Sequence, residues 1–290
     1  MSGPSGVYTA LITPFKRTGA LNLRVLPDLI RFQRKAGVDG IVVGGTNGEG
    51  ISLSVRERKR LLEAVLTHAD GLEVIAATGA CAITDAIELT RHASYHGVAA
   101  LLVLPPFYFK EPEPRGVAAY YAAVAAATEL PLILYSIPQF SGVPIGEEVL
   151  GQLAHYRSIY GVKESSPASE PAYRLLRDYP SLRLFVGNDL YLSELLQAGA
   201  AGVISGTANA LPELVVAVAR AVRERRDPWE AQERLNSAIS VIADYPIVGT
   251  VKSILAARGV ARTYTRAPLV MPSPAQRRTL LSELKRRGLL

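Results

Sequence analysis

Residues 40–57, GIVVGGTNGEGISLSVRE, contain a complete βα unit and decide the fold. Residues 40–44 form a short apolar run of strand length, and the glycines and polar residues after it indicate a turn. Ser54 and Glu57 then have the spacing of a capping box, in which each side chain accepts a hydrogen bond from the other residue's backbone N–H. A helix is therefore predicted to begin after Ser54 and to end near Ala69.

The same unit recurs along most of the chain. The predicted strands cover residues 7–13, 40–44, 73–78, 99–104, 131–135, 159–163, 182–186 and 202–205. Eight such strands alternating with helical patterns favour an α/β fold, a closed parallel (β/α)8 TIM barrel. An open doubly wound sheet is the alternative, but no G-x-G-x-x-G follows the first strand and the pattern does not change halfway.

The pattern changes after Arg226, because no strand candidate follows. Helices are predicted over 228–243, 248–258 and 274–287, with turn residues at Pro246, Gly259 and Pro272 between them. A chain of 290 residues is long enough for one barrel and an appendage. We therefore predict a catalytic barrel over residues 1–226 and a C-terminal extension of three helices over 227–290.

Composition excludes several classes of protein. Hydrophobic residues make up 49% of the chain, yet no run reaches the roughly 18 uncharged apolar residues of a membrane span. The net charge is +6, but its arginines are scattered without interleaved aromatic residues, so nucleic acid is not an expected partner. The first residues, MSGPSGVYTALITPF, lack the basic start of a secretory signal, and the single Cys81 agrees with a reducing compartment. We expect a cytoplasmic protein.

Lys163 is the first candidate for chemistry. The chain has seven lysines against 25 arginines, and of the seven only Lys163 lies on a predicted strand. Burial disfavours the charged form of an amine, so a barrel lysine can be a neutral nucleophile that attacks a carbonyl. The alternative is an ion pair with Glu164 at the barrel rim, which strand alternation opposes because successive side chains point to opposite faces.

Two further features could assist such a lysine. Tyr135 ends the neighbouring predicted strand, where its hydroxyl could transfer protons, although a packed core tyrosine has the same position. The turn at 44–48 can present backbone amides, Thr46 and Asn47 to a carboxylate or a phosphate, since glycines allow close approach. An ordinary βα turn with Asn47-Gly48 as its turn residues is the alternative.

Taken together, the motifs resemble the family of dihydrodipicolinate synthase and N-acetylneuraminate lyase. The resemblance extends nearly from end to end and includes Thr13-Pro-Phe15, Gly45-Thr-Asn-Gly-Glu49, Pro106-Phe-Tyr108, Ile133-Leu-Tyr135, Gly161-Val-Lys-Glu164, Gly187-Asn-Asp189, Gly202-Val-Ile-Ser205 and Arg266-Ala-Pro268. Members of this family are Schiff-base enzymes built on a (β/α)8 barrel with a helical C-terminal extension. No metal or other cofactor is expected.

The resemblance implies a role for each matching residue. Lys163 would form the imine, Tyr135 would donate and accept protons, and Thr46 would relay protons toward Tyr108. In relatives the tyrosine that matches Tyr108 reaches into a neighbouring subunit, which implies a homo-oligomer, a dimer or commonly a tetramer. The residues expected to bind the substrate are Gly45, Thr46, Asn47, Gly187, Ile204 and Phe140, with the first three at the pyruvate carboxylate.

Three departures from the synthase pattern bear on the aldehyde. Phe140 stands where the synthase has an arginine that grips the carboxylate of aspartate semialdehyde, and losing such a contact costs about 2 to 5 kcal/mol. Asn47 replaces a second threonine and, with Tyr135-Ser136, is similar to the 4-hydroxy-2-oxoglutarate aldolase branch. Phe107 and Cys81 replace polar residues that bind inhibitory lysine, so we expect no inhibition by lysine.

The leading hypothesis is a class I aldolase that joins or separates pyruvate and an aldehyde. Its substrate would be a 4-hydroxy-2-oxo acid or a 2-keto-3-deoxy sugar acid. The alternative is a 4-hydroxy-tetrahydrodipicolinate synthase that condenses pyruvate with aspartate semialdehyde. A phosphate-binding barrel using Gly206-Thr207 is a weaker candidate. A catalytically inactive binding protein is disfavoured, because the lysine and both tyrosines are present.

Overall fold

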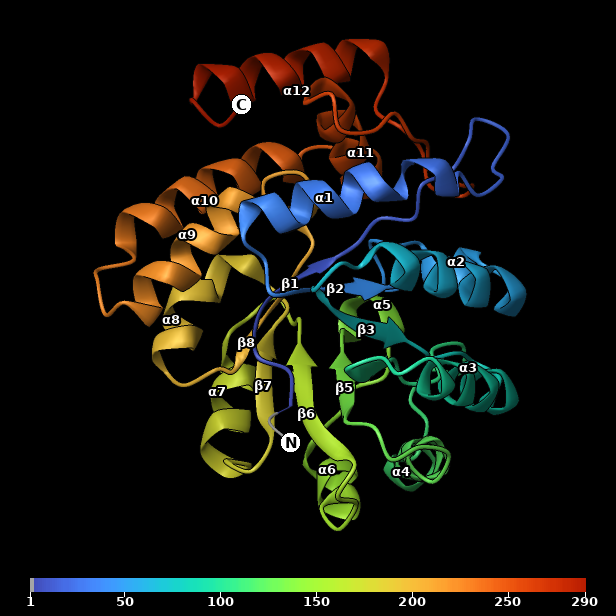
Figure 1. The fold of residues 1–290 in the computed structure, drawn as a ribbon. Coiled ribbons are helices and arrows are strands. Elements are labelled where there is room, and N and C mark those ends of the chain that lie inside the picture. The colour runs from blue at the N-terminus through green and yellow to red at the C-terminus, as the bar shows by residue number, and fades with distance from the viewer. Residues whose placement is uncertain (1–2) are drawn as a thin grey trace.

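Eight parallel strands close on themselves at the centre of the molecule (Figure 1). The computed structural model describes residues 3–290. The strands are β1 (Gly6–Ala10), β2 (Gly40–Val43), β3 (Glu73–Ala77), β4 (Ala100–Val103), β5 (Leu132–Ser136), β6 (Ile159–Glu164), β7 (Arg183–Val186) and β8 (Gly202–Ser205). Each strand pairs with the next in sequence, and β1 also pairs with β8. The predicted (β/α)8 barrel is confirmed.

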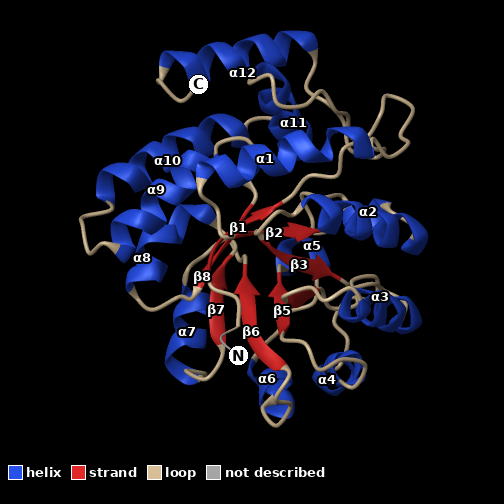
Figure 2. Cartoon of the chain, in the orientation of Figure 1, coloured by secondary structure: helices blue, strands red, loops and turns tan. Residues whose placement is uncertain are grey.

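A layer of helices surrounds the strands (Figure 2). In chain order they are α1 (Leu26–Ala36), α2 (Val55–His68), α3 (Ile83–Tyr95), α4 (Pro114–Ala125), the short α5 (Pro138–Ser141), α6 (Glu147–Leu153), α7 (Glu170–Asp178), α8 (Leu192–Gln197) and α9 (Pro212–Arg223). The capping box of Ser54 and Glu57 is present at the start of α2, as predicted. Local sequence signals therefore set at least this helix start.

Side chains inside the barrel form a separate apolar cluster. Its members come from alternate strand positions and include Tyr8, Val42, Ile75, Leu102, Ile133, Tyr135, Phe185 and Ile204. A larger cluster lies between the strands and the helices, and contains Val162 and Val186. Since register partners in parallel strands share a face, Lys163, paired with Tyr135 and Phe185, belongs to the interior face. Glu164, paired with Val186, belongs to the outer face.

Three helices follow the barrel: α10 (Trp229–Ala243), α11 (Ile247–Ala257) and α12 (Pro274–Arg286). In Figure 1, α12 runs across the outside of α10 and α11, beyond α1. The C-terminal helices are confirmed, while the boundary at 226/227 stays a prediction. Within residues 3–290 no single helix is long and apolar enough to cross a membrane; α10 and α11 reach that length only as a pair bent by 112°.

Candidate active site

Tyr135 and Lys163 occupy neighbouring positions on β5 and β6, with their α-carbons in register. The Nζ atom of Lys163 lies 4.0 Å from the centroid of the Tyr135 ring. Both residues are almost fully buried. The pairing arises because a parallel barrel places successive strands side by side and the two residues share the inward face. The amine of Lys163 and the ring of Tyr135 are thus held in contact on rigid elements.

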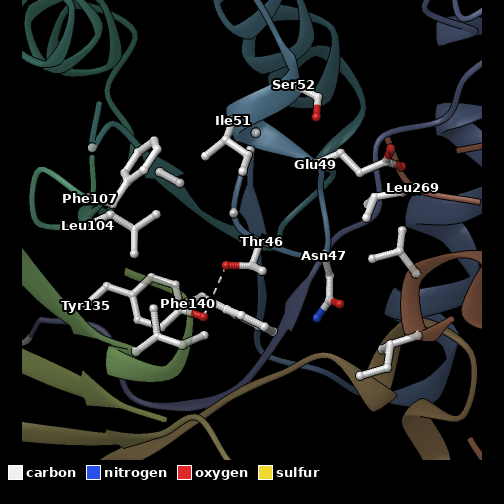
Figure 3. A pocket seen from close by; sticks show the side chains of 18 of the residues that line it. Thr46, Asn47, Glu49, Ile51, Ser52, Leu104, Phe107, Tyr135, Phe140 and Leu269 are labelled. Atoms are coloured by element: carbon white, nitrogen blue, oxygen red, sulfur yellow. Dashed lines mark hydrogen bonds between the residues drawn. The ribbon is translucent and has the colours of Figure 1, made fainter. Parts of the chain in front are cut away.

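The turn after β2 brings a second hydroxyl to this pair. The Oγ1 atom of Thr46 and the hydroxyl of Tyr135 are 3.3 Å apart, and either can donate (Figure 3). Gly44 begins the turn with φ of +76°, a conformation that residues with a side chain seldom adopt. Asn47 packs against Gly206, where a Cβ would come within 2.2 Å of its side-chain nitrogen. The turn is therefore packed against the loop that follows β8.

A cavity of about 560 Å³ opens at this end of the barrel. Five of the predicted residues line it, namely Gly45, Thr46, Asn47, Tyr135 and Phe140. Figure 3 shows the hydroxyls of Thr46 and Tyr135 directed toward each other among these side chains. The cavity volume is in the usual range of about 300 to 1,000 Å³ for small-molecule sites.

Lys163, Gly187 and Ile204 are close to the cavity but do not line it. Lys163 contacts the ring of Tyr135, which does line the cavity. Ile204 is fully buried inside the barrel. Gly187 follows β7, and a Cβ there would meet the Ser165 hydroxyl at 1.8 Å, so this close packing requires glycine. Five of the predicted residues thus line the cavity, and these three lie at the same end of the barrel without lining it.

Tyr108 is the predicted residue that the single chain does not bring into the site. Its side chain is 77% exposed and packs edge-on against Phe109. Within residues 3–290 it makes no hydrogen bond to Thr46. A proton relay through Tyr108 would therefore require a second subunit, as the resemblance implies, and it stays a prediction.

Lys252 is a buried lysine that sequence reasoning missed. It lies on α11, is fully shielded from solvent, and donates to the carbonyl oxygens of Thr13 at 2.8 Å and Tyr264 at 2.7 Å and to the Glu49 carboxylate. An ammonium has three N–H donors, so all three are used. Burial lowers the pKa of Lys252, and Glu49 opposes that effect. Its saturated hydrogen bonds mark it as a structural ion, not a free nucleophile.

Glu49, the partner of Lys252 in this ion pair, directly follows the turn at 44–48. Glu49 uses its second oxygen to accept from the backbone N–H of Arg266 at 2.8 Å. It adopts a left-handed conformation with φ of +52°, which is uncommon for a residue other than glycine. The sequence signal was available in retrospect, because Lys252 stands within the apolar run Val251-Lys-Ser-Ile-Leu255.

The loop after β8 lies beside a buried carboxylate. Asp189, which is buried, accepts from the Ser205 hydroxyl at 2.7 Å, and its carboxylate lies beside Thr207. Burial raises the pKa of Asp189, while the neighbouring Ser205 and Thr207 groups favour its charged form. A buried carboxylate so close to Gly206-Thr207 disfavours the binding of a phosphate there.

One donor set among residues 3–290 has the spacing to hold a metal ion: Glu63, His92 and His96, with ligand atoms within 4.8 Å of one another. Glu63 is on α2 and the two histidines are on α3 or at its end. The pKa of His92 is lowered, chiefly by burial and then by His96. None of the three residues lines the cavity, so the set is separate from the groups around Lys163.

Comparisons with known proteins agree with this architecture. The dihydrodipicolinate synthetase family matches residues 3–287. An uncharacterized DapA-like lyase of Chloroflexus aurantiacus is 40% identical over 83% of each chain. A 4-hydroxy-tetrahydrodipicolinate synthase of Exiguobacterium sp. is 34% identical over 97% of each chain. The crystal structure of CdNal from Clostridium difficile, in complex with mannosamine, superposes with a TM-score of 0.93 at 26% identity, covering 99% of this chain and 100% of that one.

The family match spans almost the whole chain, and the relatives are covered over most of their length. The fold is that of the matched structures. The chain therefore belongs to the dihydrodipicolinate synthetase family of lysine Schiff-base aldolases and lyases.

Proposed function

We propose that the protein is a pyruvate-dependent aldolase in which Lys163 forms the Schiff base. The observation that carries this proposal is the arrangement of Lys163, Tyr135 and Thr46: an amine against the tyrosine ring, and the tyrosine hydroxyl 3.3 Å from the threonine hydroxyl. Lys252 is the other deeply buried lysine in this region, and its donors are all used. Among residues 3–290 we find no hydrogen bond to the Nζ atom of Lys163, so its nitrogen is available.

The reaction begins when Nζ of Lys163 attacks the keto carbon of pyruvate. A C–N bond forms, the keto oxygen takes protons and leaves as water, and an iminium ion remains. Loss of a proton from the methyl carbon gives an enamine. This carbon then bonds to the carbonyl carbon of the aldehyde, whose oxygen takes a proton. Water hydrolyses the imine, releases a 4-hydroxy-2-oxo acid and regenerates the amine; cleavage is the reverse.

Tyr135 would move the protons in these steps. Its hydroxyl lies 3.3 Å from that of Thr46 and its ring lies against the Lys163 amine, so a proton could pass between the two hydroxyls without a charged side chain. The amide groups at Gly45 and Thr46 and the Asn47 side chain would hold the pyruvate carboxylate. Gly187 and Ile204 would pack around the imine.

The substrate that we propose is a 4-hydroxy-2-oxo acid or a 2-keto-3-deoxy sugar acid. Full-length relatives named 4-hydroxy-tetrahydrodipicolinate synthase make that reaction the second candidate. Phe140 argues against it, because an apolar ring cannot pair with the carboxylate of aspartate semialdehyde. We also propose a cytoplasmic homo-oligomer, a dimer or tetramer, in which Tyr108 completes a neighbouring site.

Borohydride reduction in the presence of pyruvate tests the proposal. We expect one pyruvate adduct per chain, mapped by peptide mass spectrometry to Lys163. The Lys163→Met variant should lose the adduct, whereas Lys35→Met, at an exposed helix position, should keep it. No adduct, or an adduct at Lys252, would overturn the assignment. Parallel assays with aspartate semialdehyde and for pyruvate release from hydroxy-oxo acids separate synthase from aldolase.

A further inference from the structure

The wall of the cavity opposite Thr46 and Asn47 is apolar. Ile51 and Phe107 contribute from the barrel loops, Phe140 from α5, and Ile247, Leu269 and Val270 from the C-terminal part of the chain. Figure 3 shows Ile51, Phe107, Phe140 and Leu269 around the same space as Thr46 and Tyr135. All but Phe107 are more than 40% exposed. Large apolar side chains left open at a cavity mouth mark a binding surface.

The charged groups that reach this wall are already used within the protein. The Glu49 carboxylate is paired with Lys252 and with the N–H of Arg266. Arg58 donates from its two terminal nitrogens to the carbonyl oxygens of Gly79 and Ala77, at 3.0 and 2.6 Å, so two of its five N–H donors are already used.

Few uncharged polar groups remain. The hydroxyl of Ser141 donates to the carbonyl oxygens of Ile137 and Val143, both at 3.1 Å. Two donors without a described partner are left, the Ser52 hydroxyl and Nε of Arg58. They could serve one polar substituent, whereas a sugar chain carries several hydroxyls that each need a partner when buried.

We propose that the aldehyde partner carries an uncharged, apolar substituent, either a branched aliphatic chain or an aromatic ring. This inference rests on the proposed function, since it names the second substrate of the same site. Each methylene that the wall removes from water favours binding roughly fourfold. A second carboxylate would lose its hydration against apolar side chains, and the cation among the lining residues, Arg58, already donates to two backbone carbonyl oxygens. The product is then a 4-hydroxy-2-oxo acid with an apolar tail.

An isosteric pair of aldehydes tests the substrate class. In 4-methylpentanal an isopropyl group occupies the place of the carboxylate of succinic semialdehyde. The full-length enzyme is assayed with saturating pyruvate and each aldehyde, together with benzaldehyde, glyceraldehyde and aspartate semialdehyde. We expect kcat/KM for 4-methylpentanal to exceed that for succinic semialdehyde by about tenfold or more. Equal values, or a preference for glyceraldehyde or a semialdehyde, would overturn the inference.

Two substitutions test whether the apolar wall sets the preference for 4-methylpentanal over succinic semialdehyde. Phe140→Arg should lower kcat/KM for 4-methylpentanal and raise it for succinic semialdehyde, moving their ratio by about tenfold. Leu269→Asn should lower kcat/KM for 4-methylpentanal without raising kcat/KM for succinic semialdehyde. The control is Trp229→Arg, because Trp229 is 68% exposed against 65% for Phe140 and does not line the cavity. The control should leave the ratio unchanged.

The design separates the two proposals. If pyruvate fails to form an adduct at Lys163, the proposed function fails. If the adduct forms in the parent and both variants but the aldehyde ratio does not move, only the apolar wall assignment fails. A subunit contact at the wall would instead appear as a change of sedimentation coefficient in Phe140→Arg with an unchanged ratio, and that result would also overturn the assignment.

Discussion

Glu49 and Lys252 form an ion pair in which both side chains are completely shielded from solvent. Lys252→Met should strip the Glu49 carboxylate of its partner and lower the free energy of unfolding by about 3 to 5 kcal/mol. Urea denaturation followed by circular dichroism measures this change in the free energy of unfolding. The double variant Glu49→Gln with Lys252→Met should lose less than the single one. Equal stability of Lys252→Met and the parent would contradict the structural role.

Tyr135→Phe removes the hydroxyl that faces Thr46 and leaves the ring over Lys163. We expect kcat for pyruvate release to fall by about 10² to 10⁴, the usual contribution of a positioned proton donor. Tyr121→Phe is the matched control, because Tyr121 is buried and donates to the carbonyl oxygen of Val103, outside the site. Near-parental turnover in Tyr135→Phe would show that another group moves the proton.

The stability of the protein should depend on pH through the Glu57 carboxylate. Its hydrogen bonds to Arg266 are the largest cause that holds the pKa of Glu57 at about 2, below its ordinary value of 4.5. Because the folded pKa is depressed, the stabilisation is complete above pH 4.5 and disappears as pH falls toward 2. Partial exposure limits it to about 1 kcal/mol.

Glu57→Gln keeps a capping acceptor but cannot titrate. Its unfolding free energy should therefore be lower than that of the parent at pH 6 and should converge with it near pH 2. Thermal unfolding measured at intervals from pH 6 to pH 2 gives the comparison, with the exposed Glu170→Gln as control. A constant difference across this range would rule out the Arg266 contact as its source.

Lysine should not inhibit the enzyme. Phe107 lines the cavity and Cys81 is exposed, and neither provides the charged or amide groups that would bind an amino acid. We expect initial rates at millimolar lysine to equal those without it. A strong decrease would show that a lysine site exists elsewhere in the protein.

Most of the barrel could be predicted from the sequence because its signals are local. The apolar run at 40–44 became β2, the Ser54 and Glu57 capping box started α2, and adjacency of consecutive strands put Tyr135 beside Lys163. These features depend on short-range patterns and on a topology in which neighbours in sequence are neighbours in space.

The remaining features depend on contacts between distant segments. Lys252 is buried only because α11 packs over the turn that contains Glu49, 203 residues away in sequence. The apolar wall is missed for the same reason, since Ile247 and Leu269 come from predicted helices and loops whose placement no local pattern fixes. The role of Tyr108 depends on contacts with a second subunit, because its side chain is exposed in the single chain.

The buried Lys252 and the N–H of Arg266 bind one carboxylate, and that carboxylate belongs to the turn proposed to hold pyruvate. In the sequence these two donors lie between Ile247 on one side and Leu269 and Val270 on the other, and all three of these residues line the cavity. Glu49 thus links the turn that would hold pyruvate to the C-terminal segment that lines the rest of the cavity. Lining residues of that C-terminal segment could be exchanged to admit a new aldehyde, while the contacts of Glu49 keep the amine and the incoming carbonyl aligned.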